Sequence, residues 1–513
     1  MTRESEKTAT TQPATQSEPA GPQTDRRTVL KGIGATGVAA AGITSFTYLP
    51  GLRLTREARA AEGGPVKVGF IEDESGNLSV YGIQKLHAAQ LAVKEINEGK
   101  TLKGAPAIGT GGYSALGQYA SRPPVIGKEG TDLPVVDDGG PKDQSGVIFS
   151  EDDDVLVDSG DNGILGREVQ LVSVDGQSNN ALWQQLTRRL IQEDKVDVLV
   201  AGFASAEREA IRPIVDQFKQ LYFYTNQYEG GVADAHTFCT GPVCEQQVIP
   251  VVQYMVEKFG PNCYTIAADY NFGQLTAAWT RAFLPLVGGK VVGEEFIPLS
   301  VSEFSQVIAR IQQAKPDWVM TLLVGQNHHN YYPQAAAAGL DFPMASTVNM
   351  AQGYEHKRFA PPSLKNMHNA IQYQLEVPTE RNRAFVKRWM AMFPDDQYIG
   401  EMAQNTYFTI HLYAKAARIA GTTDQETVRK ALELGWSIEA PEGAVFLEPG
   451  THHCAHYIRL AVCDENHNVH FVREWPMIQA WWLQRLGVNL VRHPEYKQYV
   501  PDEDPYFTMF LKK

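Results

Sequence analysis

The sequence predicts an α/β protein with two domains, each built around a parallel sheet with helices on both faces. Short apolar runs alternate with amphipathic helical stretches from residue 66 to residue 392. Apolar runs of this kind are typical of strands that are buried on both faces. The repeats are too numerous for one sheet, and we therefore expect two.

The repeating part of the chain begins with a strand at 66–71, followed by a helix with Leu86, Leu91 and Ile96 on its apolar side. Six further runs are predicted to be strands: 169–174, 196–200, 221–224, 264–268, 318–324 and 370–373. The predicted helices between them are 182–192, 207–218, 247–258, 272–286, 301–313 and 381–392. After Gly435 the pattern changes to antiparallel strands or crossings at 444–447, 457–462 and 469–472. An aromatic tail follows, which we expect to pack onto one domain.

The composition is that of a globular protein. The chain has 513 residues, of which 43% are hydrophobic and 10% aromatic, and these fractions are too high for a disordered chain. It carries 46 basic and 59 acidic residues, a net charge of −13. Affinity for nucleic acids comes from clustered Lys and Arg, so this balance predicts no nucleic-acid partner. The net charge does not exclude a neutral or cationic small molecule as the ligand.

Residues 1–60 are predicted to be an export signal of the twin-arginine type. Arg26-Arg27 precedes an apolar run rich in Gly and Ala at 32–52, and Ala58-Arg59-Ala60 supplies the small-x-small pattern of a cleavage site. The alternative is a transmembrane anchor, which is disfavoured because polar residues and a proline interrupt the run. We expect the signal to be removed from the mature protein.

The cysteines bear on the compartment of the mature protein. The first of the five is Cys239, so no cysteine follows the signal that would carry a lipid anchor. We therefore expect a soluble, periplasmic or otherwise extracytoplasmic protein without membrane insertion. In an oxidising compartment Cys239 and Cys244 are candidates for a disulfide bond, which their spacing alone leaves open.

The stretch 100–160 interrupts the repeating pattern. It is rich in glycine and proline and carries more acidic than basic residues. It is too long for an ordinary connection, so we predict an insertion that either folds by itself or forms a flexible excursion. Its acidic end suggests calcium, but position 12 counted from Asp158 is Val169, where a calcium loop has Glu. A solvated acidic loop is the preferred interpretation.

The motifs of common enzyme classes are absent from the sequence: it has no H-E-x-x-H, Walker loop, G-x-S-x-G or C-x-x-C. We therefore expect a protein that is not an enzyme and has no cofactor or metal ion. The alternative is an exported metal-dependent enzyme, because in an extended strand His452, Cys454 and His456 would share one face and bind zinc. No fourth ligand is evident, so hydrogen-bonded histidines at the start of a strand are preferred.

Polar and aromatic side chains follow several predicted strands, at the carboxyl ends where open α/β sheets bind ligands. The candidate binding residues at these positions are Phe203, Ser205, Tyr224, Asn226, Gln227, Tyr228, Tyr270, Phe272 and Gln326. Ser205 is equally a candidate cap for the helix that follows it. Together they describe a small, mostly neutral site with aromatic walls, which suits a small polar ligand.

These segments resemble a known family. The opening at 66–98 and the segment 161–167 are similar to the type I periplasmic binding proteins. More specific are Ser205-Ala206-Glu207-Arg208, the sequence YTNQYEG at 224–230, Asp269-Tyr270 and the sequence APEG at 440–443. This set is similar to the branch that binds urea and short-chain amides, which includes solute-binding proteins and amide sensors. The likeness covers nearly all of 66–474, apart from the insertion.

The resemblance implies two Rossmann-like lobes joined by three hinge crossings, with the ligand in the cleft between them. Lobe one is expected at 66–241 and 378–441, lobe two at 244–374 and 444–474, crossings near 241–243, 374–378 and 441–444, and the tail at 475–513. Matched residue by residue, Tyr270 and Phe272 contribute from lobe two, and the candidates from Phe203 to Tyr228 contribute from lobe one.

The sequence differs from the pattern of this branch at positions that are expected to contact the ligand. The branch usually has a carboxylate that accepts ligand N–H bonds after 343–346, whereas this chain has Ala351 there. Asn349, beside it, joins the candidate residues, and Gln352 is also near. An amino-acid receptor of this family would have an Asp after Gly241, where this chain has Pro242, and a buried ammonium needs a paired charge.

The resemblance thus implies an exported substrate-binding protein of an ABC transporter, which captures urea or a short-chain amide for a permease and ATPase complex. Three alternatives remain open. They are a branched-chain amino-acid receptor of the same fold, a sensor that reports the ligand to a partner, and the exported metal-dependent enzyme.

Overall fold

The computed structural model describes residues 63–107 and 155–505. The predicted export signal and most of the predicted insertion lie outside the described residues. Among the helices of these described residues, none combines the length and the apolar character needed to cross a bilayer.

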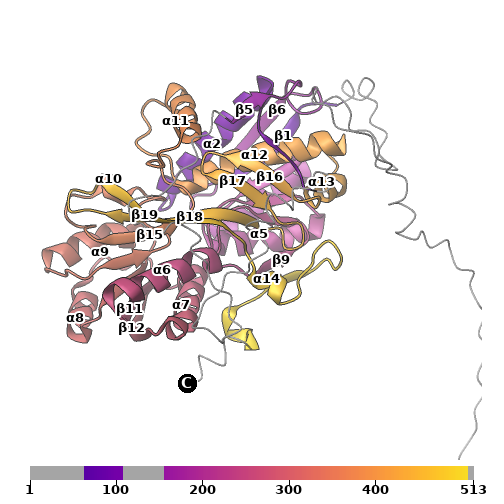
Figure 1. The fold of residues 1–513 in the computed structure, drawn as a ribbon. Helices are drawn as coiled ribbons and strands as arrows, with labels where there is room; N and C mark the ends of the chain where they lie inside the picture. Colours follow the sequence, from indigo (N-terminus) through magenta and orange to yellow (C-terminus); the bar gives the residue numbers. More distant parts are fainter. Residues whose placement is uncertain (1–62, 108–154, 506–513) are drawn as a thin grey trace, which may run out of the picture. The chain divides into compact units, whose positions relative to one another are not determined.

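The first sheet consists of five parallel strands in the order β10-β8-β7-β1-β6. Figure 1 labels two of them, β1 and β6. These strands are β1 (Val66–Glu72), β6 (Val169–Asp175), β7 (Val198–Ala201), β8 (Tyr222–Tyr224) and β10 (Thr237–Cys239). The helices of this part are α2 (Ser79–Asn97), α4 (Asn180–Arg189) with the π turn η2 (Leu190–Asp194), α5 (Ser205–Phe218), α12 (Glu401–Ala420) and α13 (Gln425–Leu432). α2 and α12 lie side by side. β7 and most of β1 are fully buried, as their apolar sequences predict.

The second sheet has ten strands in the order β12-β11-β13-β14-β15-β18-β17-β16-β3, with β19 also paired to β18. Its parallel part contains β12 (Lys290–Ile297), β11 (Asn262–Ala268), β13 (Trp318–Leu322), β14 (Met344–Ser346) and β15 (Met367–Ile371). Its antiparallel part contains β18 (Cys454–Cys463), β19 (Val469–Ile478), β17 (Gly443–Leu447), β16 (Trp436–Ala440) and β3 (Gly104–Pro106).

Six further helices lie between β10 and α12 in the chain. They are α6 (Cys244–Phe259), α7 (Asn271–Phe283) with the 3-10 turn η3 (Leu284–Val287), α8 (Ser305–Ala314), α9 (Gln326–Ala337), α10 (Glu355–Arg358) and α11 (Glu380–Met392). β18 joins the parallel and antiparallel parts of this sheet. Its residues Cys454 and Ala455 pair with β17, and its residues Arg459 to Val462 pair with β15.

The α/β class with parallel sheets is confirmed, and so are the antiparallel strands after Gly435. Several elements differ from the prediction, and three of them show the physical reasons. α12 was not predicted, because almost every side chain in it is buried and its sequence shows no polar face. β12 was missed because it lies at the edge of its sheet and its residues are mostly half-buried. β15 begins earlier than predicted, at Met367, because its first residues include the polar His368 and Asn369.

The ends of the predicted insertion belong to the fold. β2 (Lys100–Leu102) pairs with β5 (Leu156–Asp158), and β3 pairs with β16. The stretch that interrupts the α/β pattern is therefore shorter than 100–160. The predicted crossing at 441–444 coincides with the turn between β16 and β17, which form one antiparallel ladder. The lobe boundaries themselves stay predictions.

The C-terminal segment is built into the protein. β19 ends at Ile478, beyond the predicted start of the tail at residue 475. Beyond it come α14 (Trp482–Arg485), β20 (Tyr496–Gln498) and the 3-10 turn η4 (Pro501–Glu503), and β20 pairs with β9 (Val232–Asp234). The ring of Trp482 lies edge-on to Trp279 of α7, with centroids 4.9 Å apart. The tail thus contacts α7 and forms a small two-stranded sheet with β9, separate from the two large sheets.

Glu245, at the start of α6, makes stability depend on pH. It is buried, it accepts the backbone N–H of Trp482 at 3.3 Å, and burial raises its pKa from 4.5 to about 7. The folded protein therefore binds more protons than the unfolded chain between these values, and stability is lost as the pH rises from about 4.5 to 7. We expect Glu245→Gln to remove this loss, about 1–3 kcal/mol, so that calorimetry shows a higher Tm than wild type at pH 8 but not at pH 4.5. Parallel Tm curves for the two proteins would contradict it.

Candidate functional site

A small cavity lies where the carboxyl ends of strands from both sheets meet. Its lining residues are Phe203, Ser205, Tyr224, Asn226, Gln227, Tyr270, Phe272, Val324, Val348 and Gln352. They follow or end β7 and β8 of the first sheet and β11, β13 and β14 of the second. This is the place where an open α/β sheet presents its loops to a ligand.

The structure brings seven of the ten predicted residues together around this cavity: Phe203, Ser205, Tyr224, Asn226, Gln227, Tyr270 and Phe272. Tyr228, Gln326 and Asn349 do not line it. Gln326 is exposed at the start of α9, and Asn349 is buried with its side-chain oxygen accepting the N–H of Met350 at 2.7 Å.

Tyr228 is turned into the protein. Its hydroxyl lies 2.5 Å from Nε2 of His453 and accepts the N–H of Val232 at 3.2 Å. His453 Nδ1 lies 2.7 Å from the carbonyl of Thr451, and burial lowers the pKa of this imidazole to about 4. The neutral ring thus donates from Nδ1 and accepts the Tyr228 proton at Nε2. This hydroxyl is committed to the core.

Three lining residues were outside the predicted set. Val324 and Val348 supply apolar wall, and Gln352 supplies an amide. Gln352 was missed because it follows β14, a strand of three residues that the apolar pattern did not reveal. The sequence did offer one indication of this position, because Ala351, the residue before Gln352, stands where the urea and amide branch usually has a ligand-binding carboxylate.

The start of α5 is capped by Glu207 and not by Ser205. The Glu207 carboxylate accepts the N–H groups of Phe203 at 2.9 Å and of Ala204 at 2.8 Å. Ser205 is the first residue of the helix, and its hydroxyl donates to Glu229 at 2.5 Å. Its predicted capping role is therefore wrong, because the carboxylate three residues into the helix takes the free N–H groups.

A buried ion pair supports this wall. Arg208 donates to Glu229 at 2.7 Å, and the side chains of both residues are almost fully buried. The guanidinium lies over the rings of Tyr224 and Tyr228, at 4.9 and 4.4 Å from their centroids. The two rings meet edge to face. Arg208 therefore holds Glu229, and through it Ser205, while it packs against the aromatic wall.

A second network joins the two sides of the cavity. Gln352 Nε2 donates to Asn226 Oδ1 at 3.1 Å and to Glu401 Oε1 at 2.6 Å. The other oxygen of Glu401 accepts the side-chain amides of Gln372 at 2.8 Å and Asn405 at 2.7 Å. Burial raises the pKa of Glu401 to about 7, although these bonds oppose the rise. Glu401 is the first residue of α12, the helix that the sequence did not reveal.

Tyr81 of α2 closes the aromatic wall. Its ring stacks on Phe203 at 4.0 Å with an interplanar angle of 2°. Its hydroxyl accepts the N–H of Gly325 at 3.3 Å, just before α9. This bond connects α2, which follows β1 of the first sheet, to the segment after β13 of the second sheet.

Among the described residues, the lining carries no carboxylate, ammonium or guanidinium group. Tyr224 and Tyr270 are the only ionisable side chains in this described lining, and burial raises the pKa of both phenols well above the usual value. The cavity is therefore neutral at physiological pH. Gln227 and Tyr270 make no side-chain hydrogen bond to another described residue, which leaves their polar groups available to a ligand.

The zinc site considered at 452–456 is not formed. His452 has φ 61°, so this residue is not extended, and β18 begins only at Cys454. His452 lies 3.2 Å from Glu433, and His456 lies 2.7 Å from Glu442. The five cysteines are free and buried, so Cys239 and Cys244 form no disulfide bond.

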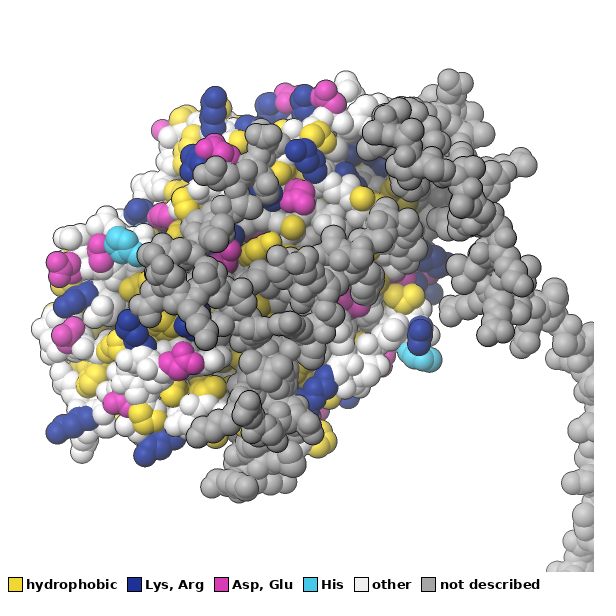
Figure 2. Space-filling model, viewed as in Figure 1, with side chains coloured by type: hydrophobic (Ala, Val, Ile, Leu, Met, Phe, Trp, Pro, Cys, Tyr) yellow, Lys and Arg dark blue, Asp and Glu magenta, His cyan; other side chains and the backbone are white. Residues whose placement is uncertain are grey.

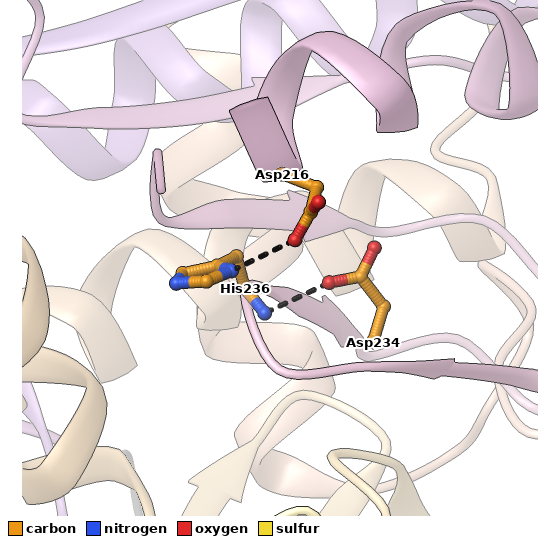
Figure 3. A group of neighbouring side chains, drawn as sticks. All are labelled: Asp216, Asp234 and His236. Atoms are coloured by element: carbon orange, nitrogen blue, oxygen red, sulfur yellow. Dashed lines mark hydrogen bonds and ion pairs between the residues drawn. The ribbon is translucent and has the colours of Figure 1, made fainter. Parts of the chain in front are cut away.

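Among the described residues, one group of three potential ligands comes within 4.8 Å: Asp216, Asp234 and His236 (Figure 3). Asp234 Oδ2 already pairs with Arg212 at 3.3 Å, and its Oδ1 accepts the backbone N–H of His236 at 2.9 Å. His236 Nδ1 lies 3.6 Å from Asp216. The group is accounted for by these ion pairs and the turn.

The charges visible on one face of the described residues are of mixed sign. On the face shown in Figure 2, Lys and Arg side chains are interspersed with Asp and Glu, and neither sign forms a continuous patch on the described residues. The neutral cavity is therefore more informative about the ligand than the net charge.

Comparisons with known proteins agree with the fold. A relative, the Leu/Ile/Val-binding protein homolog 6 of Brucella melitensis, is 21% identical over 339 residues, which is 63% of this chain and 84% of the relative. A solute-binding protein of an ABC transporter from Rhodopseudomonas palustris, solved with 3,4-dihydroxybenzoic acid, has a TM-score of 0.62 and 17% identity and covers 81% of this chain and 98% of its own. The branched-chain amino acid transporter substrate-binding protein LivJ from Streptococcus pneumoniae, solved with isoleucine, has a TM-score of 0.60 and 16% identity and covers 80% and 99%.

At these identities the solved structures show the shared fold alone. The family model for periplasmic binding proteins matches residues 65–468, which is most of the chain and includes every residue that lines the cavity. The chain therefore belongs to the periplasmic binding protein family and has its type I α/β fold.

Proposed function

We propose that this protein is the extracytoplasmic substrate-binding protein of an ABC transporter, and that it captures urea or a short-chain amide for a permease and ATPase complex. The observation that carries the proposal is the neutral cavity between the carboxyl ends of the two sheets. Export by the twin-arginine route belongs to the same proposal and rests on the sequence of residues 26–60.

The chemistry of the lining favours a neutral solute over the ligands of the solved relatives. Isoleucine carries an ammonium and a carboxylate, and a benzoate carries a carboxylate. A buried charge needs a partner of opposite charge, and the lining offers neither a cation nor an anion.

The capture mechanism follows from the contacts across the cavity. The bonds Gln352–Asn226 and Gly325–Tyr81 join segments that follow strands of different sheets. A solute that bonds to both sides adds to these contacts and stabilises the closed arrangement, which a permease can recognise. Gln227 offers an amide from one side and Tyr270 a hydroxyl from the other.

Calorimetric titration of the mature protein tests the proposal. We expect urea, formamide or acetamide to bind and to raise the Tm, and we expect leucine, isoleucine and benzoate to do neither. Gln227→Ala should weaken binding about tenfold or more by removing an amide contact, whereas the control Gln326→Ala, at an exposed position outside the cavity, should leave it unchanged. Binding of isoleucine or benzoate in place of the amides would contradict the proposed ligand.

Transport and sensing are separated by uptake of the labelled solute. A strain that lacks this protein should lose uptake if it is a transport receptor. Normal uptake in that strain, with lost transcriptional or signalling response to the solute, would favour the sensor.

A further inference from the structure

The orientation of the Gln352 amide is determined by its neighbours. Its nitrogen carries two hydrogens, and these are directed to Asn226 Oδ1 and Glu401 Oε1. Glu401 receives three amide N–H donors on its two oxygens, which suits an ionised carboxylate and not a donor. Gln352 Oε1 makes no hydrogen bond to another described residue, and the residue lines the cavity. The group that Gln352 offers to a solute is therefore an acceptor.

Ser205 is constrained in the same way on the opposite wall. Its one hydroxyl hydrogen is directed to Glu229 Oε2 at 2.5 Å, and Glu229 is paired with Arg208. The lone pairs of the Ser205 oxygen remain for the cavity. The hydroxyl hydrogen of Tyr224 is also committed, to the carbonyl of Phe203 at 2.6 Å. On one wall the Glu401 carboxylate thus accepts a hydrogen of Gln352, and on the other the Glu229 carboxylate accepts the hydrogen of Ser205.

We propose that Glu401 and Glu229 are positioning residues that make Gln352 and Ser205 hydrogen-bond acceptors, so that the cavity selects a solute by the number of N–H groups it carries. This inference rests on the proposed function and specifies its substrate class. A solute without N–H groups would leave these buried acceptors unpaired when it displaces water, which costs affinity at each of them.

Urea, acetamide and acetone test the inference, because they share one framework: a carbonyl that carries two, one or no NH₂ groups, with methyl in the other positions. Titrations are made at pH 8, above the pKa of Glu401. We expect Kd to rise about tenfold or more with each NH₂ that is replaced by methyl. Equal binding of the three solutes would overturn the inference and leave a receptor for small carbonyl solutes. Binding by none of them would overturn the proposed function and the inference with it.

Glu401→Gln tests the role of the carboxylate. The new amide can present a hydrogen to Gln352, whose own amide is then free to turn its nitrogen to the cavity. We expect the ratio of the acetone and urea dissociation constants to fall from about a hundredfold to less than tenfold. A merely structural effect would weaken all three solutes alike, so an unchanged ratio overturns the inference.

Glu245→Gln is the matched control, because Glu245 is also buried with its pKa raised to about 7 but bonds to Trp482 and to no lining residue. We expect it to keep the wild-type ratio. If the Glu401 variant does not fold, Ser205→Ala gives the same test from the other wall. It should weaken urea about tenfold and acetone little, and equal weakening of both would overturn the inference.

Discussion

Replacing Arg208 with leucine is expected to lower the free energy of unfolding by about 3–5 kcal/mol, because it leaves the buried Glu229 carboxylate without its cation. Both side chains are almost completely shielded from water, so solvent cannot take over the role of the guanidinium. The variant also loses the packing of Arg208 on Tyr224 and Tyr228. Calorimetry should show a clearly lower Tm, and solute binding should weaken because Ser205 bonds to the same carboxylate.

The cause is tested by removing the unpaired charge. In the double variant Arg208→Leu with Glu229→Gln, most of the lost Tm should return, since a neutral amide is less costly to bury than a carboxylate. Arg310→Leu breaks an exposed ion pair with Glu295 and serves as the control, with little change in Tm expected. A double variant as unstable as the single one would show that packing and not charge dominates.

Replacing Trp482 with alanine is expected to destabilise the protein by about 3–5 kcal/mol and to release the C-terminal segment. The indole is 1% exposed, lies against Trp279 and donates from Nε1 to Asp504 at 2.9 Å. Its removal leaves a cavity between α7 and the tail and breaks the bond to Asp504, whereas the backbone N–H that bonds to Glu245 of α6 remains. Calorimetry should show the lower Tm, and limited proteolysis should cut the chain after about residue 480.

Val491→Ala is the control for this prediction. Val491 belongs to the same segment but is 48% exposed, so its truncation should change neither the Tm nor the cleavage pattern measurably. If Trp482→Ala resists proteolysis as wild type does, the tail is held by the β20–β9 pairing rather than by the indole.

Much of the fold was predictable from continuous apolar runs. β1, β7, β8 and β11 lie within a few residues of their predictions, because each is almost completely buried and is therefore rich in apolar residues. α12 escaped prediction for the opposite reason. It is surrounded by protein, so polar and apolar residues do not separate onto two faces of this helix.

The candidate site was predictable to the extent that it follows strand ends. The rule that ligands bind at the carboxyl ends of parallel strands selected Asn226 and Tyr270, which line the cavity. The rule does not say which of several consecutive side chains faces the cavity, so Tyr228 was included although it points to His453. Gln352 escaped because its preceding strand is too short to be recognised.

The sequence by itself determined the α/β class, the family likeness and the polar, uncharged character of the binding residues, because these depend on residue type and local periodicity. Only the tertiary structure decided which hydrogens those residues have left to offer. Glu229 and Glu401 lie 24 and 49 residues from Ser205 and Gln352 in the chain, and no local pattern predicts that they meet. A side chain's hydrogen-bonding role at a site depends on the neighbours that have already taken its hydrogens, and those neighbours are brought to it by folding.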